Sequence, residues 1–277
     1  MRRRCWRKGL KPIPVIIVRG METLLIDRAG GVVTVTLNRP EKKNAINDTM
    51  WDELLQTFLA IANNTPEDRV VVITGAGGAF CSGADIGGGR VEESNGLTSM
   101  RHVGDVCAAL HALPQPVIAK VVGVAAGAGL NLALGCDLIV ASDDARFSEI
   151  FARRGLSVDF GGSWVLPRLV GMHKAKELVF FADTIGAKEA QEVGIVNRVV
   201  PAAEIDAFVN DWTSRLAAGP PLALSMSKRL LNQSSAVSLG QALEAEALAQ
   251  NVNFQSHDTA EAMLAFVQKR DPRFEGR

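Results

Sequence analysis

The sequence predicts an α/β fold in which helices cover a parallel sheet and a mostly helical region follows. Short continuous apolar runs alternate with segments whose apolar residues recur at helical spacing. Such alternation is typical of parallel βαβ units. From about Gly161 onward helical patterns prevail. We therefore expect a basic extension over residues 1–20, an α/β core over 21–215 and a helical region over 216–277.

The core begins with a predicted β-hairpin, because residues 24–27 and 32–37 alternate apolar and polar side chains around Gly30-Gly31. Asn47-Asp48 can cap a helix with apolar positions up to Ile61. Further on, continuous apolar runs predict buried strands. The expected strands are 70–74, 116–122, 137–141 and 196–200, and the expected helices are 98–112, 127–134, 220–231 and long helices within 241–267.

Charge is distributed unevenly along the chain. The first twenty residues hold seven basic side chains and no acid, so the rest carries 23 basic against 30 acidic residues, a net charge of about −7. A body this acidic is not expected to bind nucleic acid. No stretch approaches the ~18 apolar residues of a membrane helix. The four cysteines form no C-x-x-C pair, which favours a cytoplasmic protein with reduced thiols.

The basic extension admits several interpretations. A signal peptide needs a longer apolar stretch than residues 13–18 and a small-residue cleavage site, whereas Arg19-Gly20 follows here. A transit peptide stays an alternative, although the extension lacks Ser. The simplest interpretation is a disordered extension or an over-extended start, with Met21 as the natural beginning.

Two loops rich in Gly and Ala, 75–86 and 123–131, follow predicted strands. Ligands bind at the carboxyl ends of parallel strands, and a helix starting at Gly127 would direct free N–H groups toward one. Taken alone, each loop could equally serve tight packing between a helix and a strand instead of ligand binding. A dinucleotide fingerprint at residues 75–77 is disfavoured, because the acidic residues near the required spacing, Glu92 and Glu93, lie in a polar loop.

Together the two loops resemble the crotonase superfamily, the enoyl-CoA hydratase/isomerase family. Residues 80–86 (FCSGADI) resemble its F-(C/S)-x-G-x-D-(I/L) loop, and 120–129 (KVVGVAAGAG) is similar to its A-x-x-x-G-x-x-x-G-(G/A)-G segment. The resemblance extends from Met21 onward. It implies a spiral of ββα units with a helical C-terminal region, an acyl-CoA thioester as substrate, no metal or other cofactor, and a homotrimer or dimer of trimers.

The resemblance also implies a site. Two backbone N–H groups form the family's oxyanion hole for the thioester carbonyl, and the matching positions here are Ala84 and Ala128. The implied substrate-binding positions are Asn44, Ala45, Ala84, Asp85, Ile86, Gly87, Gly127, Asn131 and Phe151.

The acids and bases near this hole decide the reaction. Family hydratases use two glutamates, and the matching positions here are Asn131 and Phe151, which cannot titrate. Asp159 instead resembles the proton-shuttling Asp of the isomerase branches, notably the epoxyphenylacetyl-CoA isomerases of the phenylacetate pathway and the dienoyl-CoA isomerases. Among Val158, Phe160 and Phe151 its carboxylate would lose hydration, which raises its pKa toward a useful proton shuttle.

Three alternatives stay open. Asp159 could cap the helix that begins near Gly161. Glu149 lies two residues before Phe151, so a bulge would bring it into the site on the same face as a hydratase acid; otherwise it is a rim charge. The chain could also be a non-catalytic acyl-CoA-binding homologue. Other nucleophile schemes are disfavoured, because the sequence has no G-x-S-x-G elbow and its histidines show no H-E-x-x-H spacing.

Overall fold

The computed structural model describes residues 20–85 and 96–277, so the expectations for residues 1–19 and for Ile86 and Gly87 lie outside the described residues. A six-stranded sheet in the order β1-β2-β3-β4-β6-β9 forms the centre of the core. Its strands are β1 (Leu24–Ala29), β2 (Val32–Leu37), β3 (Val70–Gly75), β4 (Val117–Val121), β6 (Leu138–Ser142) and β9 (Arg198–Val200). The first pair is antiparallel and every other pair is parallel, which confirms the predicted hairpin and parallel strands.

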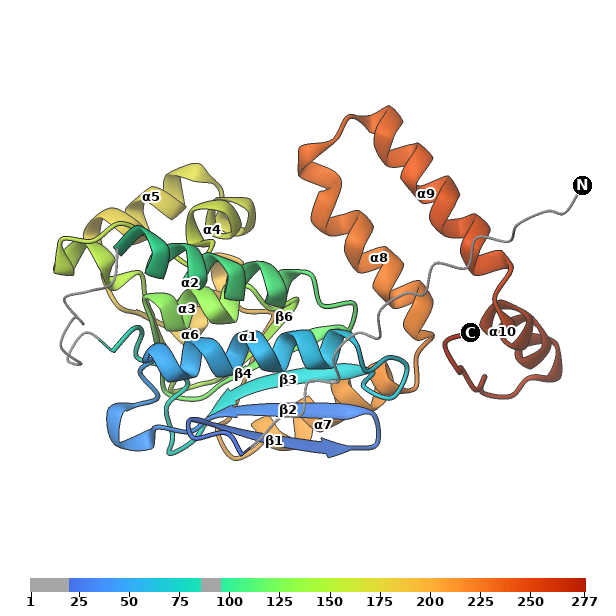
Figure 1. Cartoon of the computed structure of the whole chain (residues 1–277), viewed down its shortest axis with the longest axis horizontal. Coiled ribbons are helices and arrows are strands. Elements are labelled where there is room, and N and C mark those ends of the chain that lie inside the picture. Colours follow the sequence, from blue (N-terminus) through green and yellow to red (C-terminus); the bar gives the residue numbers. More distant parts are fainter. Residues whose placement is uncertain (1–19, 86–95) are drawn as a thin grey trace, which may run out of the picture.

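Helices cover both faces of this sheet (Figure 1). On one side lie α1 (Asp48–Ala62), α2 (Gly96–His111) and α3 (Ala128–Leu134), and on the other lies α7 (Ile205–Ala217). The predicted cap of α1 is confirmed, because the Asn47 side chain accepts a hydrogen bond from the Met50 N–H at 3.0 Å. α7 packs Ile205 and Val209 against side chains from β3, β4 and β6. Because helices cover both faces of the sheet, the buried strands consist of continuous apolar runs.

A second, three-stranded sheet was not predicted. It consists of β5 (Val124–Ala126), β7 (Arg146–Ser148) and β8 (Ile185–Gly186), in that order. Residues 196–200 were the only strand expected after Gly161, and β8 shows that this expectation was wrong. Strands of two or three residues are too short to show alternation in the sequence. The chain passes from β4 to β5 through Gly123, whose φ of 64° suits glycine.

A helical arm follows α7 in the chain. The other elements of the core are η1 (Pro40–Lys42), η2 (Ile150–Arg154), α4 (Gly162–Val170), α5 (Met172–Phe181) and α6 (Ala187–Glu192). The arm consists of α8 (Pro221–Gln233), η3 (Ser234–Ala236), α9 (Leu239–Phe254) and α10 (His257–Gln268), and Figure 1 shows it projecting away from the sheet. The predicted helical stretch 241–267 is divided, because Ser256 caps a new helix by accepting from the Thr259 N–H at 3.2 Å.

The arm is tied to the core by Lys228 of α8. Its ammonium group lies 2.7 Å from Asp137 Oδ2 and donates to the carbonyl of Gln115 at 2.9 Å. Among residues 20–85 and 96–277, no helix combines the length and the apolar character needed to cross a membrane.

Candidate active site

The loop that follows β3 is held between two neighbouring segments. On one side the Cys81 N–H donates to the Val124 carbonyl at 2.9 Å, and the Ala126 N–H donates to the Cys81 carbonyl at 3.0 Å. On the other side the Ile46 N–H donates to the Gly83 carbonyl and the Asp85 N–H donates to the Ile46 carbonyl, each at 2.8 Å. Four backbone hydrogen bonds therefore fix residues 81–85 against β5 and the segment before α1.

This arrangement sets the direction of the Ala84 N–H. Successive backbone groups of an extended segment point to opposite sides. Since Gly83 and Asp85 bond toward Ile46, the Ala84 N–H points away from Ile46, toward β5 and the start of α3. Ala128 is the first residue of α3, and its N–H has no helical partner. Within the described residues, neither N–H donates to a protein acceptor.

The two loops approach so closely that glycine is required at the contacts. A Cβ on Gly83, whose φ is 107°, would lie 3.0 Å from the Ala126 carbonyl oxygen and 3.9 Å from the Ala128 nitrogen. A Cβ on Gly129 would lie 2.4 Å from the Cys81 carbonyl oxygen. These contacts place the segments that carry Ala84 and Ala128 against each other, as an oxyanion hole built from their two N–H groups would need.

Asp159 lies on a turn directly before α4. Its side-chain Oδ1 is buried and has no hydrogen-bond partner among the described residues, and burial raises the pKa of this carboxyl to about 6. The alternative role as a helix cap is wrong: Gly161 occupies the N-cap of α4, and no side chain makes the cap hydrogen bond. Asp159 contributes only its backbone carbonyl, which accepts from the Gly162 N–H at 2.9 Å. Its carboxylate is thus available for chemistry.

Glu149 is brought to the same place by the unpredicted sheet. β7 pairs with β5, and the Gly127 N–H donates to the Ser148 carbonyl at 2.9 Å, so Glu149 follows directly beside the start of α3. Its side chain is only 2% exposed, and neither carboxyl oxygen has a hydrogen-bond partner among the described residues. Burial and the nearby charge of Asp159 raise its pKa to about 8, while the Asn131 amide acts in the opposite direction. Glu149 is therefore not a rim charge.

Two further predicted residues border these carboxyl groups. The ring of Phe151 lies against Gly127, where an added Cβ would be 3.7 Å from its Cζ atom. Asn131 is buried on α3, and its Nδ2 donates to the Asp159 carbonyl at 3.0 Å. Both lie beside the predicted oxyanion hole, and their roles in substrate binding stay predictions.

The other predicted substrate-binding residues shape the loop. Asn44 is fully buried, and its side chain donates to the carbonyls of Ala76 and Ala79 at 2.9 and 2.7 Å. Asp85 forms an ion pair with Arg39 at 2.9 Å, and Arg39 also donates to the Ala45 carbonyl. The side chains of Asn44 and Asp85 are thus already engaged by the protein.

Sequence reasoning missed one residue at the site, Cys107 of α2. A Cβ on Gly161 would lie 2.8 Å from its Sγ atom. Burial and the nearby charge of Asp159 raise the pKa of the Cys107 thiol, which keeps it neutral at ordinary pH. Nothing in the sequence marks this cysteine, because its position depends on how α2 packs over the Asp159 turn. In the described part of the chain, no three His, Cys, Asp or Glu side chains are grouped to hold a metal ion.

Chemically, backbone donors beside a buried carboxyl group can stabilise negative charge on an oxygen while a proton moves. The family model for enoyl-CoA hydratase/isomerase matches residues 27–277, and the chain belongs to this family.

Individual relatives agree with this assignment. The chain is 40% identical to a Rhodobacter capsulatus protein named probable enoyl-CoA hydratase, over 92% of this chain and 98% of that one. It is 34% identical to the 1,2-epoxyphenylacetyl-CoA isomerase of Escherichia coli, over 93% of this chain and 100% of that one. The crystal structure of an enoyl-CoA hydratase from Bacillus anthracis matches with a TM-score of 0.86 at 31% identity, covering 92% and 100% of the two chains. The predicted crotonase-like fold and family are confirmed.

Proposed function

We propose that the protein isomerises a double bond or a ring of an acyl-CoA thioester through an enolate, with Asp159 as the proton shuttle. The observation that carries this proposal is the state of the Asp159 carboxyl, whose Oδ1 is buried without a partner among residues 20–85 and 96–277 and whose pKa is raised to about 6. A pKa just below neutral lets one group both remove and return a proton. The E. coli relative named as an isomerase supports the same reaction class.

The reaction assigns a role to each group. The thioester carbonyl accepts hydrogen bonds from the Ala84 and Ala128 N–H groups, and the Asp159 carboxylate removes a proton from a carbon conjugated with that carbonyl. The electron pair released moves into the carbon framework, and the negative charge collects on the carbonyl oxygen. Return of the proton from Asp159 to a different carbon shifts the double bond and restores the carboxylate. Each backbone donor would contribute roughly 3–4 kcal/mol to the transition state.

Hydration of a 2-enoyl-CoA is the second candidate, and Glu149 favours it. With a pKa of about 8, Glu149 is protonated at neutral pH, whereas Asp159 is ionised. A neutral acid beside an ionised base is the pair that water addition needs: the base activates water and the acid supplies a proton. The relatives named as hydratases support this alternative.

Mass spectrometry of the products separates the two reactions. The purified protein would be incubated with 2-enoyl-, 3-enoyl- and aryl-acetyl-type CoA thioesters. An isomer keeps the mass of the substrate, whereas hydration adds the mass of one water. We expect isomerisation that is lost in Asp159→Asn and kept in Glu149→Gln and in the exposed control Asp105→Asn on α2. Water addition that is lost in Glu149→Gln would overturn the proposal. Tight thioester binding without turnover would indicate a non-catalytic homologue.

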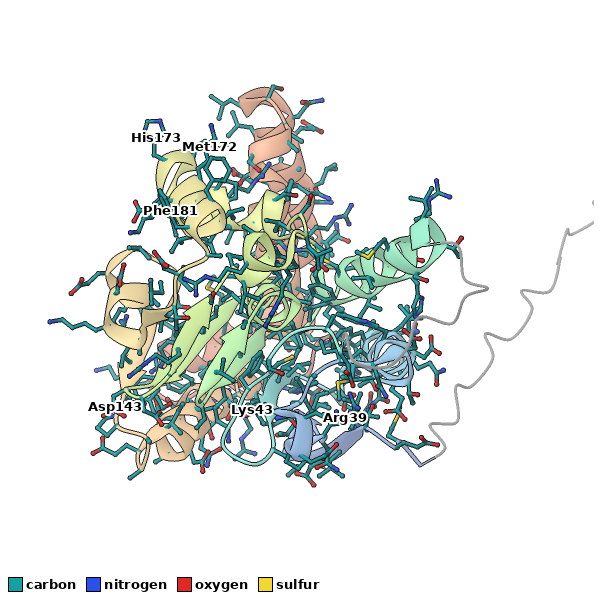
Figure 2. All side chains as sticks on the ribbon, turned by 90° about the vertical axis from the view of Figure 1, so that its left-hand side faces the viewer. Arg39, Lys43, Asp143, Met172, His173 and Phe181 are labelled. Carbon is teal, nitrogen blue, oxygen red and sulfur yellow. The ribbon has the colours of Figure 1, made fainter. Side chains whose placement is uncertain are left out.

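We also propose that the chain acts as a homotrimer or dimer of trimers. Figure 2 shows Met172, His173 and Phe181 of α5 directed outward, and Phe181 is 67% exposed. The arm exposes a second apolar set, which comprises Leu231, Leu239, Leu243, Leu248, Val252, Phe254, Met263, Leu264, Phe266 and Val267. So much exposed apolar surface is typical of protein–protein contacts. Light scattering of the 29.6 kDa chain should give about three or six chain masses, and a monomer would contradict this proposal.

A further inference from the structure

Asn131 lies where the helix of the predicted oxyanion hole meets the turn that carries Asp159. It belongs to the first turn of α3, and its N–H donates to the Gly127 carbonyl at 3.0 Å. It lies three positions after Ala128 in the same helix, so the helix fixes its position relative to the Ala128 N–H. The side chain is 1% exposed, and its Oδ1 has no hydrogen-bond partner among the described residues.

The turn after Val158 has a backbone that needs support. Phe160 has a φ of 44°, unusual for a residue other than glycine, and Gly161 follows with a φ of 74°. Such conformations persist only where the surroundings hold them. Here the ring of Phe160 stacks on Trp51 with 5.4 Å between centroids, and Asn131 Nδ2 donates to the Asp159 carbonyl at 3.0 Å.

The Asn131 amide also fits sterically against the far end of the turn. A Cβ on Gly162 would lie 2.4 Å from Asn131 Oδ1 and 2.5 Å from Nδ2. The amide therefore occupies the space over Gly162, whose own N–H donates to the same Asp159 carbonyl at 2.9 Å. One side chain thus connects α3 to both ends of the Asp159–Gly162 turn.

We propose that Asn131 is a positioning residue, which holds the Asp159 carboxylate at a fixed distance and angle from the Ala128 N–H. This inference rests on the proposed function, because it concerns proton transfer by Asp159. Replacing Asn131 would leave the Ala84 and Ala128 donors and the Asp159 carboxyl in the protein but remove the connection between them. A misplacement of about 1 Å between reacting groups can cost about 100-fold in rate.

Three variants test the proposal. Asn131→Ala removes the amide, Asn131→Asp keeps its size but removes the donor, and Asn210→Ala on the exposed face of α7 is the control. Hydrogen–deuterium exchange of the peptide 156–166, measured by mass spectrometry, reports the turn independently of activity. The kinetic readouts are kcat and KM for proton exchange on the best thioester, together with the pH profile of kcat/KM.

We expect faster amide exchange in 156–166 and a kcat lowered about 10- to 100-fold for both Asn131 variants, with a smaller change in KM than in kcat. In Asn131→Asp the new carboxyl would lie between Asp159 and Glu149, and wherever it ionises its negative charge should move the low-pH limb to higher pH. An unchanged kcat in Asn131→Ala would overturn the proposal, as would a loss explained wholly by a smaller folded fraction. If wild-type protein moves no proton on any thioester, the proposed function fails instead, and faster exchange in 156–166 would then show a structural role only.

Discussion

Lowering the pH from about 7 to about 5 should slow proton transfer roughly tenfold, because it protonates Asp159. Burial raises the pKa of this carboxyl from 3.8 to about 6. About nine-tenths of the group is then ionised at pH 7 and about one-tenth at pH 5. The neighbouring titratable groups keep their charge between pH 5 and pH 7, since Glu149 has a pKa of about 8 and the pKa of the Cys107 thiol is raised.

The assay is kcat/KM for isomerisation of the best thioester between about pH 5 and pH 9 at constant ionic strength. Glu149→Gln should keep the rising limb, because isomerisation by Asp159 needs no second acid. A rate that stays flat between pH 5 and 7 would refute the reasoning, since it would indicate an aspartate of ordinary pKa. If the product is instead the hydrated thioester, a falling limb above about pH 8 together with loss of activity in Glu149→Gln would assign Glu149 as the acid of hydration.

Three further predictions follow from the same contacts. Because the pKa of Glu149 rises from 4.5 to about 8 on folding, stability falls as pH rises through that range. Glu149→Gln should therefore raise Tm at about pH 9 but not at about pH 4. Calorimetry would measure this rise, which should be about 2–4 °C for each kcal/mol by which the substitution increases the free energy of unfolding. Gly129→Ala places a Cβ 2.4 Å from the Cys81 carbonyl oxygen and should lower kcat about 100-fold by moving α3; a normal kcat would exclude the tight contact. Lys228→Ala removes the 2.7 Å contact with Asp137 and should speed proteolysis between the core and the arm, whereas unchanged cleavage would mean that other contacts hold α8.

Elements with local signals could be predicted from the sequence. The hairpin around Gly30-Gly31 and the cap at Asn47 depend on neighbouring residues, and both are present in the structure. The buried strand β3 was predictable from its continuous apolar run, which it has because helices cover both its faces. The motif resemblance was enough to predict Ala84 and Ala128 as the oxyanion-hole positions. That their two loops lie side by side follows from the backbone hydrogen bonds between the loops, which the sequence does not reveal.

Features that depend on tertiary pairing could not be predicted. Glu149 reaches the site because β7 pairs with β5, and three-residue strands leave no readable pattern. The link from Asn131 to Asp159 joins residues 28 positions apart in the sequence, and no local spacing rule relates two residues so far apart. The left-handed conformation of Phe160 is likewise unusual for its residue type, so no local preference would have suggested it.

The most direct test of the account is solvent deuterium exchange at carbons conjugated with the thioester carbonyl. Wild-type protein and Asp159→Asn would be incubated with the best CoA thioester in deuterated water, and the recovered thioester would be analysed by mass spectrometry. We predict that wild-type protein introduces deuterium without adding water, and that Asp159→Asn binds the thioester equally well but exchanges at least about 100-fold more slowly. Undiminished exchange in Asp159→Asn would contradict the assignment of Asp159 as the proton shuttle.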